Sequence, residues 1–165
     1  MTQTALKIKT WPDPALRSKC IAVAKVDARV RDLLDRMCML MRLHKGVGLA
    51  ANQVGLDERL IVVEVTDRVF KLVNPRITRK EGEISFLEGC LSFPGLEIKI
   101  KRSSKIWISA LDESGQAIEI EASGVLAVVF QHEIDHIDGI VFISRLDLLE
   151  RLKALTRPRL AHKKS

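Results

Sequence analysis

The chain has 165 residues, of which 47% are hydrophobic, and a formal net charge of +6. We expect residues 1–156 to form a single domain with a buried core. Because no apolar run is long enough to cross a membrane and no apolar signal segment follows Met1, we expect a cytoplasmic protein rather than a membrane or secreted one.

One amphipathic helix and several β-like runs follow one another along the first part of the chain. Asp27 is a candidate N-cap, and apolar residues spaced by three and four predict a helix over 28–43. Asn74-Pro75 is expected to end a run, and Asp112-Glu113-Ser114-Gly115 is expected to be a hairpin turn. The β-like runs are 60–65, 69–73, 97–100, 105–111 and 117–121.

Two more helices are expected towards the C-terminus. Ser123 is a candidate N-cap for a helix over 124–137, with Gly139 as its stop. By propensity alone this valine-rich segment also suits a strand, and the helix prediction depends on the histidine spacing described next. A third amphipathic helix, ending before Arg157-Pro158, is indicated by Leu146, Leu149, Leu152 and Leu155. Strands flanked by separated helices predict an α+β domain.

The clearest chemical signal is His132-Glu133-Ile134-Asp135-His136. Residues four apart lie about one turn along the same helix face, so both imidazoles can bind one metal ion. Glu133 lies about 100° further round the helix, where it can act as a base at an open coordination position. The less favoured interpretation is a solvated helix face that happens to carry two histidines.

Catalytic metal sites of this kind usually have three protein ligands plus a water. Downstream of the motif only Glu150 and His162 could complete the set, and neither has the spacing of a familiar metallopeptidase. Upstream, Glu88-Gly89-Cys90-Leu91-Ser92 offers a thiolate, and the glycine before the cysteine permits a close backbone approach. Cys20 and Cys38 are interpreted as buried structural cysteines of a reducing compartment.

A third segment reads Gly46-Val47-Gly48-Leu49-Ala50-Ala51-Asn52-Gln53. Its glycines and small residues allow another backbone, such as an extended peptide, to come close. A glutamine side chain can donate a hydrogen bond to a developing oxyanion. Taken alone, the segment is more simply interpreted as a tight glycine turn after a helix.

Together these three segments resemble the three signatures of the peptide deformylase family, in the family's order: 46–53, 88–92 and 131–136. Residues 12–17, Asn74-Pro75 and Phe93-Pro94-Gly95 extend the resemblance over about residues 6–155. The resemblance implies an antiparallel β framework wrapped around a central helix that carries both histidines. It also implies a metal-dependent hydrolase that removes the formyl group from the N-terminal formylmethionine of nascent polypeptides.

The resemblance further implies that Cys90, His132 and His136 bind one divalent metal ion, with water in the fourth position. Fe²⁺ is the expected metal, and Zn²⁺, Ni²⁺ or Co²⁺ are alternatives. Glu133 would be the general base and then the acid, and Gln53 and the backbone N–H of Leu91 would stabilise the oxyanion. No covalent intermediate is needed, so Cys90 would not be a nucleophile.

Other roles are expected around this site. Asp135 is a candidate partner for the outer nitrogen of a metal-bound imidazole, and Glu88 is expected to pair with Arg102. The substrate methionine needs an apolar pocket, although the valines of 125–129 suit a plain core equally well. The residues expected to contact substrate are Val47, Gly48, Gly89 and Val129.

The chain departs from the family pattern at three points. Asn52 stands where Pro or Thr is more common, and Glu97 stands where many bacterial members have an arginine that contacts the substrate backbone. The chain also contains no tyrosine. These departures leave the metal ligands and Gln53 intact, and they leave substrate preference beyond methionine open.

The positive charge is concentrated at the C-terminal end. From Arg145 onward seven Lys or Arg oppose two acidic residues, which leaves +5 in the last 21 residues, and we interpret 157–165 as a basic tail. The expected partners are N-formylmethionyl peptides, with no DNA and no membrane. The tail is interpreted first as a solubilising segment, and the family resemblance offers docking on the ribosome near its tunnel exit as the alternative. Three alternatives stay open: a peptidase using His132, Glu133 and His136, an RNA-binding protein acting through the tail, and an inactive family member.

Overall fold

The structure is a computed structural model that describes residues 5–156. Its main sheet has five antiparallel strands in the spatial order β1 (Gly48–Ala50), β2 (Leu60–Val65), β3 (Arg68–Glu81), β6 (Lys105–Leu111) and β7 (Ala117–Ser123). A second antiparallel sheet pairs β4 (Ile84–Gly89) with β5 (Glu97–Arg102). The predicted α+β class with an antiparallel framework is confirmed.

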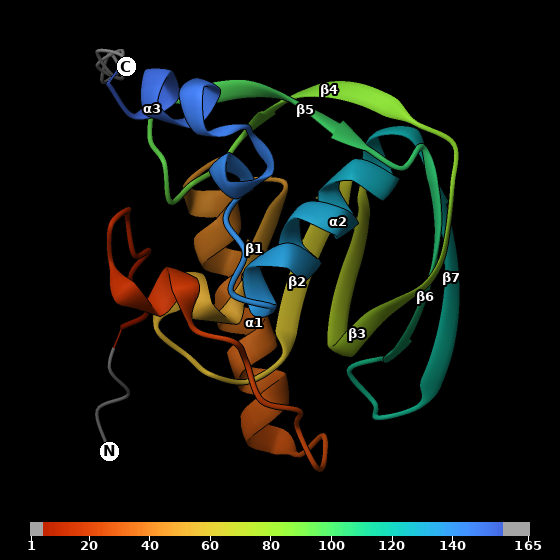
Figure 1. The fold of residues 1–165 in the computed structure, drawn as a ribbon. Helices are drawn as coiled ribbons and strands as arrows, with labels where there is room; N and C mark the ends of the chain where they lie inside the picture. The colour runs from red at the N-terminus through yellow and green to blue at the C-terminus, as the bar shows by residue number, and fades with distance from the viewer. Residues whose placement is uncertain (1–4, 157–165) are drawn as a thin grey trace.

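Helix α2 (Gly124–Ile137) lies in the middle of the molecule, with the strands of the main sheet curved around it and the β4–β5 hairpin arching across the top of the view (Figure 1). Every residue from Ala127 to Ile137 is buried. A helix covered on all sides needs apolar residues all round, which is why its valines also suited a strand. The structure confirms the helix. Ser123 occupies the N-cap position without a side-chain capping bond, and Gly139 follows the helix with φ +76°.

Two other helices flank this centre. Helix α1 (Ala28–Leu43) has the predicted bounds, and the Asp27 carboxylate accepts a hydrogen bond from the Val30 N–H at 2.9 Å. Helix α3 (Leu148–Thr156) buries only Ala154. The leucines that suggested its amphipathic pattern are therefore mostly exposed to solvent. Three short 3₁₀ helices complete the fold: η1 (Pro14–Arg17), η2 (Ala51–Val54) and η3 (Phe142–Arg145).

The prediction that Asn74-Pro75 ends a strand is wrong, since β3 continues to Glu81. Asn74 adopts a left-handed conformation with φ +53°, which asparagine tolerates better than most residues, and the register to β6 shifts between Val73 and Arg76. At such a bulge a proline costs little, because its missing N–H is not needed for the ladder. The Asn74 side chain also binds the Val23 backbone in both directions, at 2.8 Å each.

The remaining differences concern strands that have little periodic pattern of their own. β1 and β4 were not predicted, and β5 and β7 extend further than expected, to Arg102 and Ser123. β1 is only three residues long and entirely buried, so it shows no alternation of exposed and buried residues. The hairpin turn at 112–115 is confirmed by the antiparallel pairing of β6 with β7.

Two hydrophobic clusters hold the elements together. The larger one lies between α1, α2 and the main sheet, and the smaller one lies beneath the loop that carries Cys90 and includes Leu16, Phe93, Ile100 and Phe142. Among residues 5–156 no helix is both long and apolar enough to cross a membrane. The predicted basic tail, 157–165, lies outside the described residues.

Candidate metal centre

Three side chains with metal-binding atoms converge beside α2. His132 and His136 are one helical turn apart, and their Nε2 atoms are 3.2 Å from each other. The Sγ atom of Cys90 lies 3.2 Å from Nε2 of His136. The ligand atoms of all three residues lie within 4.8 Å of one another. A single metal ion placed between them could contact all three.

The position of Cys90 is set by a tight turn after β4. The Phe93 N–H donates to the Cys90 carbonyl at 2.9 Å, and Leu96 donates to the Phe93 carbonyl at 3.1 Å. Phe93 is fully buried and stacks on Trp11 with a ring-centroid distance of 5.4 Å. The apolar anchor of Phe93 thus holds the thiol against α2.

The residues present fit a divalent metal ion. A thiolate with two imidazole nitrogens is a donor set that suits Fe²⁺, Zn²⁺, Ni²⁺ and Co²⁺. The outer nitrogen of His132, Nδ1, lies 2.8 Å from Oε2 of Glu88, which orients Nε2 towards the other ligands. Nδ1 of His136 is buried and has no hydrogen-bond partner among the described residues.

A buried network of charges surrounds the histidines. The predicted pair of Glu88 and Arg102 is present: the guanidinium donates to both carboxylate oxygens at 2.7 and 2.9 Å. Arg102 also forms a short hydrogen bond with Asp135. Asp135 in turn accepts two hydrogen bonds from Arg145.

The expectation that Asp135 is the imidazole partner is wrong. Both of its carboxylate oxygens face arginines, whereas Glu88 contacts His132. Asp135 is three residues from His132 on α2, but its side chain points towards Arg102 of β5 and Arg145 of η3. Glu88, which is distant in sequence, is brought to Nδ1 by the pairing of β4 with β5.

Glu133 follows the ligand His132 on α2 and is buried. Burial raises the pKa of its carboxyl to about 7, with the charges of Glu88 and Asp135 adding to that effect and those of His132 and Arg102 opposing it. Its Oε2 atom is buried and has no hydrogen-bond partner among the described residues. A Cβ atom at Gly48 would lie 2.7 Å from the Glu133 carboxyl carbon, so only glycine fits there.

The burial and hydrogen bonds of the network also shift the pKa values of its other members. Burial alone would raise the pKa of Glu88, but hydrogen bonds from Arg102 and His132 lower it to about 2. Burial, assisted by the charges of His132 and Arg102, lowers the pKa of His136 well below its ordinary value. Burial opposes the charged form of His132, yet its hydrogen bonds to Cys90 and Glu88 raise its pKa.

Gln53 lies on η2 with its amide aimed at the cysteine. Its Oε1 atom accepts a hydrogen bond from the Ala50 N–H at 2.8 Å, which leaves Nε2 facing Ser92 Oγ at 3.1 Å and Cys90 Sγ at 3.5 Å. Sequence reasoning did not single out the Ser92 contact, although Ser92 belongs to the quoted motif. Leu91 is half-buried beside this group and packs against the backbone of Gly46.

The residues expected to contact substrate occupy different environments. Gly48 lies on β1, which is an edge strand of the main sheet, and Gly89 ends β4 opposite Glu97. Val47 is 53% exposed, whereas Val129 is 7% exposed and belongs to the main core. Asn52, the departure from the family pattern, donates a short hydrogen bond to the carbonyl of His136 and so ties η2 to α2.

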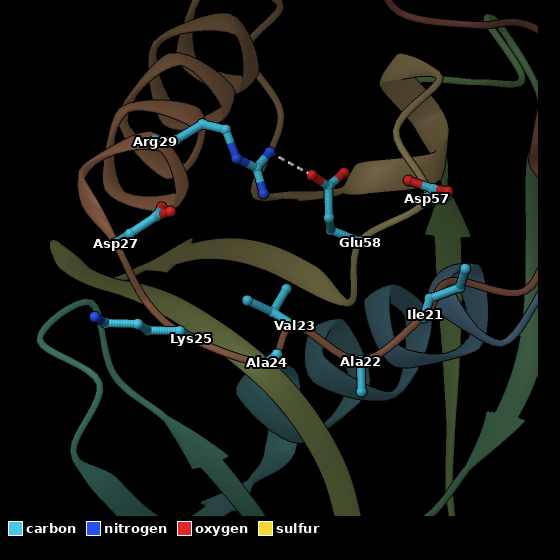
Figure 2. A pocket seen from close by; sticks show the side chains of 9 residues that line it. All are labelled: Ile21, Ala22, Val23, Ala24, Lys25, Asp27, Arg29, Asp57 and Glu58. Atoms are coloured by element: carbon cyan, nitrogen blue, oxygen red, sulfur yellow. Dashed lines mark hydrogen bonds and ion pairs between the residues drawn. The ribbon is translucent and has the colours of Figure 1, made fainter.

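A separate groove of about 400 Å³ lies on another part of the surface (Figure 2). It is lined by residues 21–25 together with Asp27, Arg29, Asp57 and Glu58. Arg29 and Glu58 form an ion pair of 2.5 Å across it. The groove contains none of the three converging ligands, so it is distinct from the metal centre.

The fold and this site define a metalloprotein in which two histidines of α2 and a cysteine from the loop after β4 share one centre. The family model described as polypeptide deformylase matches residues 5–152. The chain is 44% identical over 151 residues to the peptide deformylase of Thermodesulfovibrio yellowstonii, covering 88% of this chain and 92% of that protein. It is 40% identical over 164 residues to the peptide deformylase of Neisseria meningitidis, covering 95% and 97%.

Solved structures of peptide deformylases have the same fold as this chain. A peptide deformylase from Legionella pneumophila is similar with a TM-score of 0.87 and 38% identity, covering 92% of each chain. One from Ehrlichia chaffeensis in complex with actinonin gives a TM-score of 0.88 at 36% identity, covering 93% of this chain and 95% of that one. The chain belongs to the peptide deformylase family. It is therefore an enzyme, a metal-dependent hydrolase that removes N-formyl groups.

Proposed function

We propose that Cys90, His132 and His136 hold the metal ion of the deformylation reaction. The observation that carries this assignment is the convergence of one sulfur and two Nε2 atoms within 4.8 Å in a chain of the deformylase family. We propose Fe²⁺ as the native metal, because it is the metal expected from the family resemblance. Zn²⁺, Ni²⁺ or Co²⁺ would suit the same ligands.

A divalent ion at this centre would polarise the formyl carbonyl and lower the pKa of a water molecule. Glu133 is the general base that takes a proton from the attacking water, and then the acid that returns it to the departing amine. A carboxyl pKa of about 7 suits both roles, because the group can accept and release a proton near neutral pH. Its partnerless Oε2 atom is available for that proton.

Gln53 and Leu91 supply hydrogen-bond donors for the charge that develops on the formyl oxygen. The Gln53 carbonyl is held by the Ala50 N–H at 2.8 Å, so its NH₂ group is presented to the centre without further ordering. The Leu91 N–H follows directly after the ligand Cys90. Donors fixed in advance stabilise an oxyanion most effectively, because they need not reorganise during the reaction.

The substrate peptide lies in extended form along β1, whose outer edge has no strand partner in the five-stranded order. Gly48 on this edge and Gly89 at the end of β4 allow a close approach of the peptide backbone. Val47 and Val129 contribute to the apolar pocket for the methionine side chain. The formyl group of N-formylmethionyl peptides would then reach the metal, Gln53 and Glu133 together.

The test is anaerobic hydrolysis of formyl-Met-Ala-Ser by protein loaded with Fe²⁺ or Ni²⁺, beside the Glu133→Ala variant. We expect formate release by the wild type, and its loss in the variant while metal stays bound. Release at the wild-type rate by the variant would refute the role of Glu133. Cys90→Ser should abolish tight metal binding, and full retention would point to a site built from His132, Glu133 and His136 instead.

We also propose that the chain works in the cytoplasm as one catalytic domain, 1–156, and that α3 with the basic tail 157–165 docks near the ribosomal tunnel exit. α3 exposes Leu148, Leu149 and Leu152, and it carries Arg151 and Lys153. Cations beside exposed apolar residues suit a surface of RNA and protein. Truncation after Leu155 should weaken co-sedimentation with ribosomes and leave peptide turnover unchanged. Unaltered sedimentation would refute this docking.

A further inference from the structure

The short helix η3 contacts two residues of α2 that lie about one turn apart, His132 and Asp135. A 3₁₀ helix has about three residues per turn, so Phe142 and Arg145 project from the same side of η3. The Phe142 ring contacts the imidazole of His132, with ring centroids 5.7 Å apart. Arg145 binds Asp135, which is one turn beyond His132. η3 therefore contacts a proposed metal ligand directly through one side chain and the charged network through the other.

The contact between Arg145 and Asp135 has a defined two-point geometry. Arg145 donates from Nε to Oδ2 at 2.6 Å and from Nη2 to Oδ1 at 2.5 Å. Two parallel hydrogen bonds between a guanidinium and a carboxylate restrict both distance and angle. The Arg145 side chain is 35% exposed, whereas that of Asp135 is 11% exposed. The pair thus links the surface to the buried network.

From Asp135 the contacts continue without a gap to the metal centre. Asp135 accepts a hydrogen bond from Arg102, and Arg102 donates to both oxygens of Glu88. Glu88 in turn lies 2.8 Å from Nδ1 of His132. The order from the surface inward is Arg145, Asp135, Arg102, Glu88 and His132.

The balance of charges in this network explains why Arg145 affects the position of His132. Two carboxylates, Asp135 and Glu88, share the buried guanidinium of Arg102, and Arg145 supplies a second guanidinium to Asp135. Without Arg145, Asp135 would keep only Arg102 as a cationic partner. A buried carboxylate short of positive charge draws its remaining partner more strongly. Arg102 would then be pulled towards Asp135 and away from Glu88, which orients His132.

We infer that Arg145 is a positioning residue for the metal centre: by fixing Asp135, and through it Arg102 and Glu88, it holds the His132 imidazole in its ligating orientation. This inference rests on the proposed metal site. Contacts on both sides of η3 also hold Arg145 in place. Arg151 of α3 donates to the carbonyls of Ile143 and Ser144 at 3.2 and 3.1 Å, and Phe142 packs against Phe93 of the cysteine loop.

The experiment compares Arg145→Met and Arg145→Lys with Arg59→Ala in Co²⁺-loaded protein. Arg59 is the matched control, because it binds the α2 C-cap residue Asp138 at 2.6 Å and, among residues 5–156, has no hydrogen bond to the network around His132. The rate of Co²⁺ loss to a chelator and the visible absorption of the bound ion are measured. The absorption bands report the ligand geometry, and the comparison with Arg59→Ala separates an effect on the site from a loss of overall stability.

We expect Arg145→Met to lose Co²⁺ about 10-fold faster than the wild type and to shift the absorption bands. Arg145→Lys, which keeps the charge but not the two-point geometry, should show a smaller increase of about threefold. Arg59→Ala should release Co²⁺ at the wild-type rate, even if its melting temperature falls. If Arg145→Met is too unstable to load, the Lys variant gives the decisive rate.

The inference is overturned if the foldable Arg145 variants keep the wild-type rate and spectrum, or if Arg59→Ala accelerates metal loss equally. Cys90→Ser separates this outcome from a failure of the proposed site. If Cys90→Ser loses tight Co²⁺ binding while the Arg145 variants behave as wild type, only the role of Arg145 is refuted. If Cys90→Ser keeps tight Co²⁺ binding, the proposed ligand set itself is wrong, and the inference falls with it.

Discussion

Gly48 lies so close to Glu133 that a single added methyl group should impair the reaction. In Gly48→Ala the new Cβ would lie 2.7 Å from the Glu133 carboxyl carbon and 2.8 Å from its Cγ. Carbon atoms in ordinary contact are about 3.5–4.0 Å apart, so the carboxyl must move by about 1 Å. Glu133 is 4% exposed, and its packed surroundings leave it little room to move without leaving its position beside the ligands.

A displacement of about 1 Å in a catalytic group can cost about 100-fold in rate. We therefore expect kcat for formate release to fall about 100-fold in Gly48→Ala, which corresponds to about 2.7 kcal/mol in the activation barrier. The overpacked site should also lower the free energy of unfolding by about 1–3 kcal/mol. Metal content should stay at the wild-type level, because the atoms nearest to the added Cβ belong to Glu133 and not to a proposed metal ligand.

The assay measures kcat and KM for formyl-Met-Ala-Ser with Ni²⁺-loaded protein, after the metal content of each sample has been determined. Gly89→Ala is the matched control, since its added Cβ would lie 3.9 Å from the nearest atoms, Cγ of Glu97 and the Leu96 carbonyl. Its effect should fall on KM, with kcat within about threefold of the wild type. A fully metallated Gly48→Ala with kcat within that same range would refute the reasoning.

Three further predictions concern the charges around the site. The pKa of Glu88 is lowered to about 2, so its carboxylate stabilises the metal-free fold above the ordinary value of 4.5, and that stabilisation is lost as pH falls towards 2. We expect this stabilisation to amount to about 3 kcal/mol. In urea unfolding, the wild type should have a higher free energy of unfolding than Glu88→Gln above pH 4.5, and the difference should disappear as pH falls from 4.5 to about 2. A difference that does not change with pH would contradict this prediction. Arg102→Ala should weaken metal retention, because it leaves Glu88 and Asp135 without their shared cation, and unchanged metal content after dialysis would count against this. Glu97 is exposed opposite Gly89, so Glu97→Lys should shift the kcat/KM ratio of formyl-Met-Lys over formyl-Met-Asp downward by about threefold at low salt; an unchanged ratio would exclude contact with the second residue.

Much of the fold and the candidate site could be read from local patterns. The helix over 28–43 and the strands over 60–65 and 105–111 have the predicted bounds, because a cap residue and a clear apolar period define them within the segment itself. Cys90, His132 and His136 were predicted as one metal set, and the structure brings their ligand atoms together. The helical spacing predicts both histidines as ligands, whereas Cys90 was one candidate third ligand until the resemblance to a family with three ordered signatures selected it.

Other features depend on contacts between segments that are far apart in the chain. The choice of Glu88 over Asp135 as the partner of His132 follows from the pairing of β4 with β5, and no local spacing encodes it. The continuation of β3 through Asn74 relies on the Val23 backbone, which the asparagine side chain binds from outside the strand.

The amino-acid sequence by itself therefore determined the chemistry: the ligand types, the base and the donor amide, because residue identity and short-range period are local properties. Only the tertiary structure decided which charges meet. The contact of Gly48 with Glu133 and the path from Arg145 to His132 arise where η3, β1 and β4 pack around α2. Such contacts depend on packing in three dimensions, and a one-dimensional pattern does not carry that information.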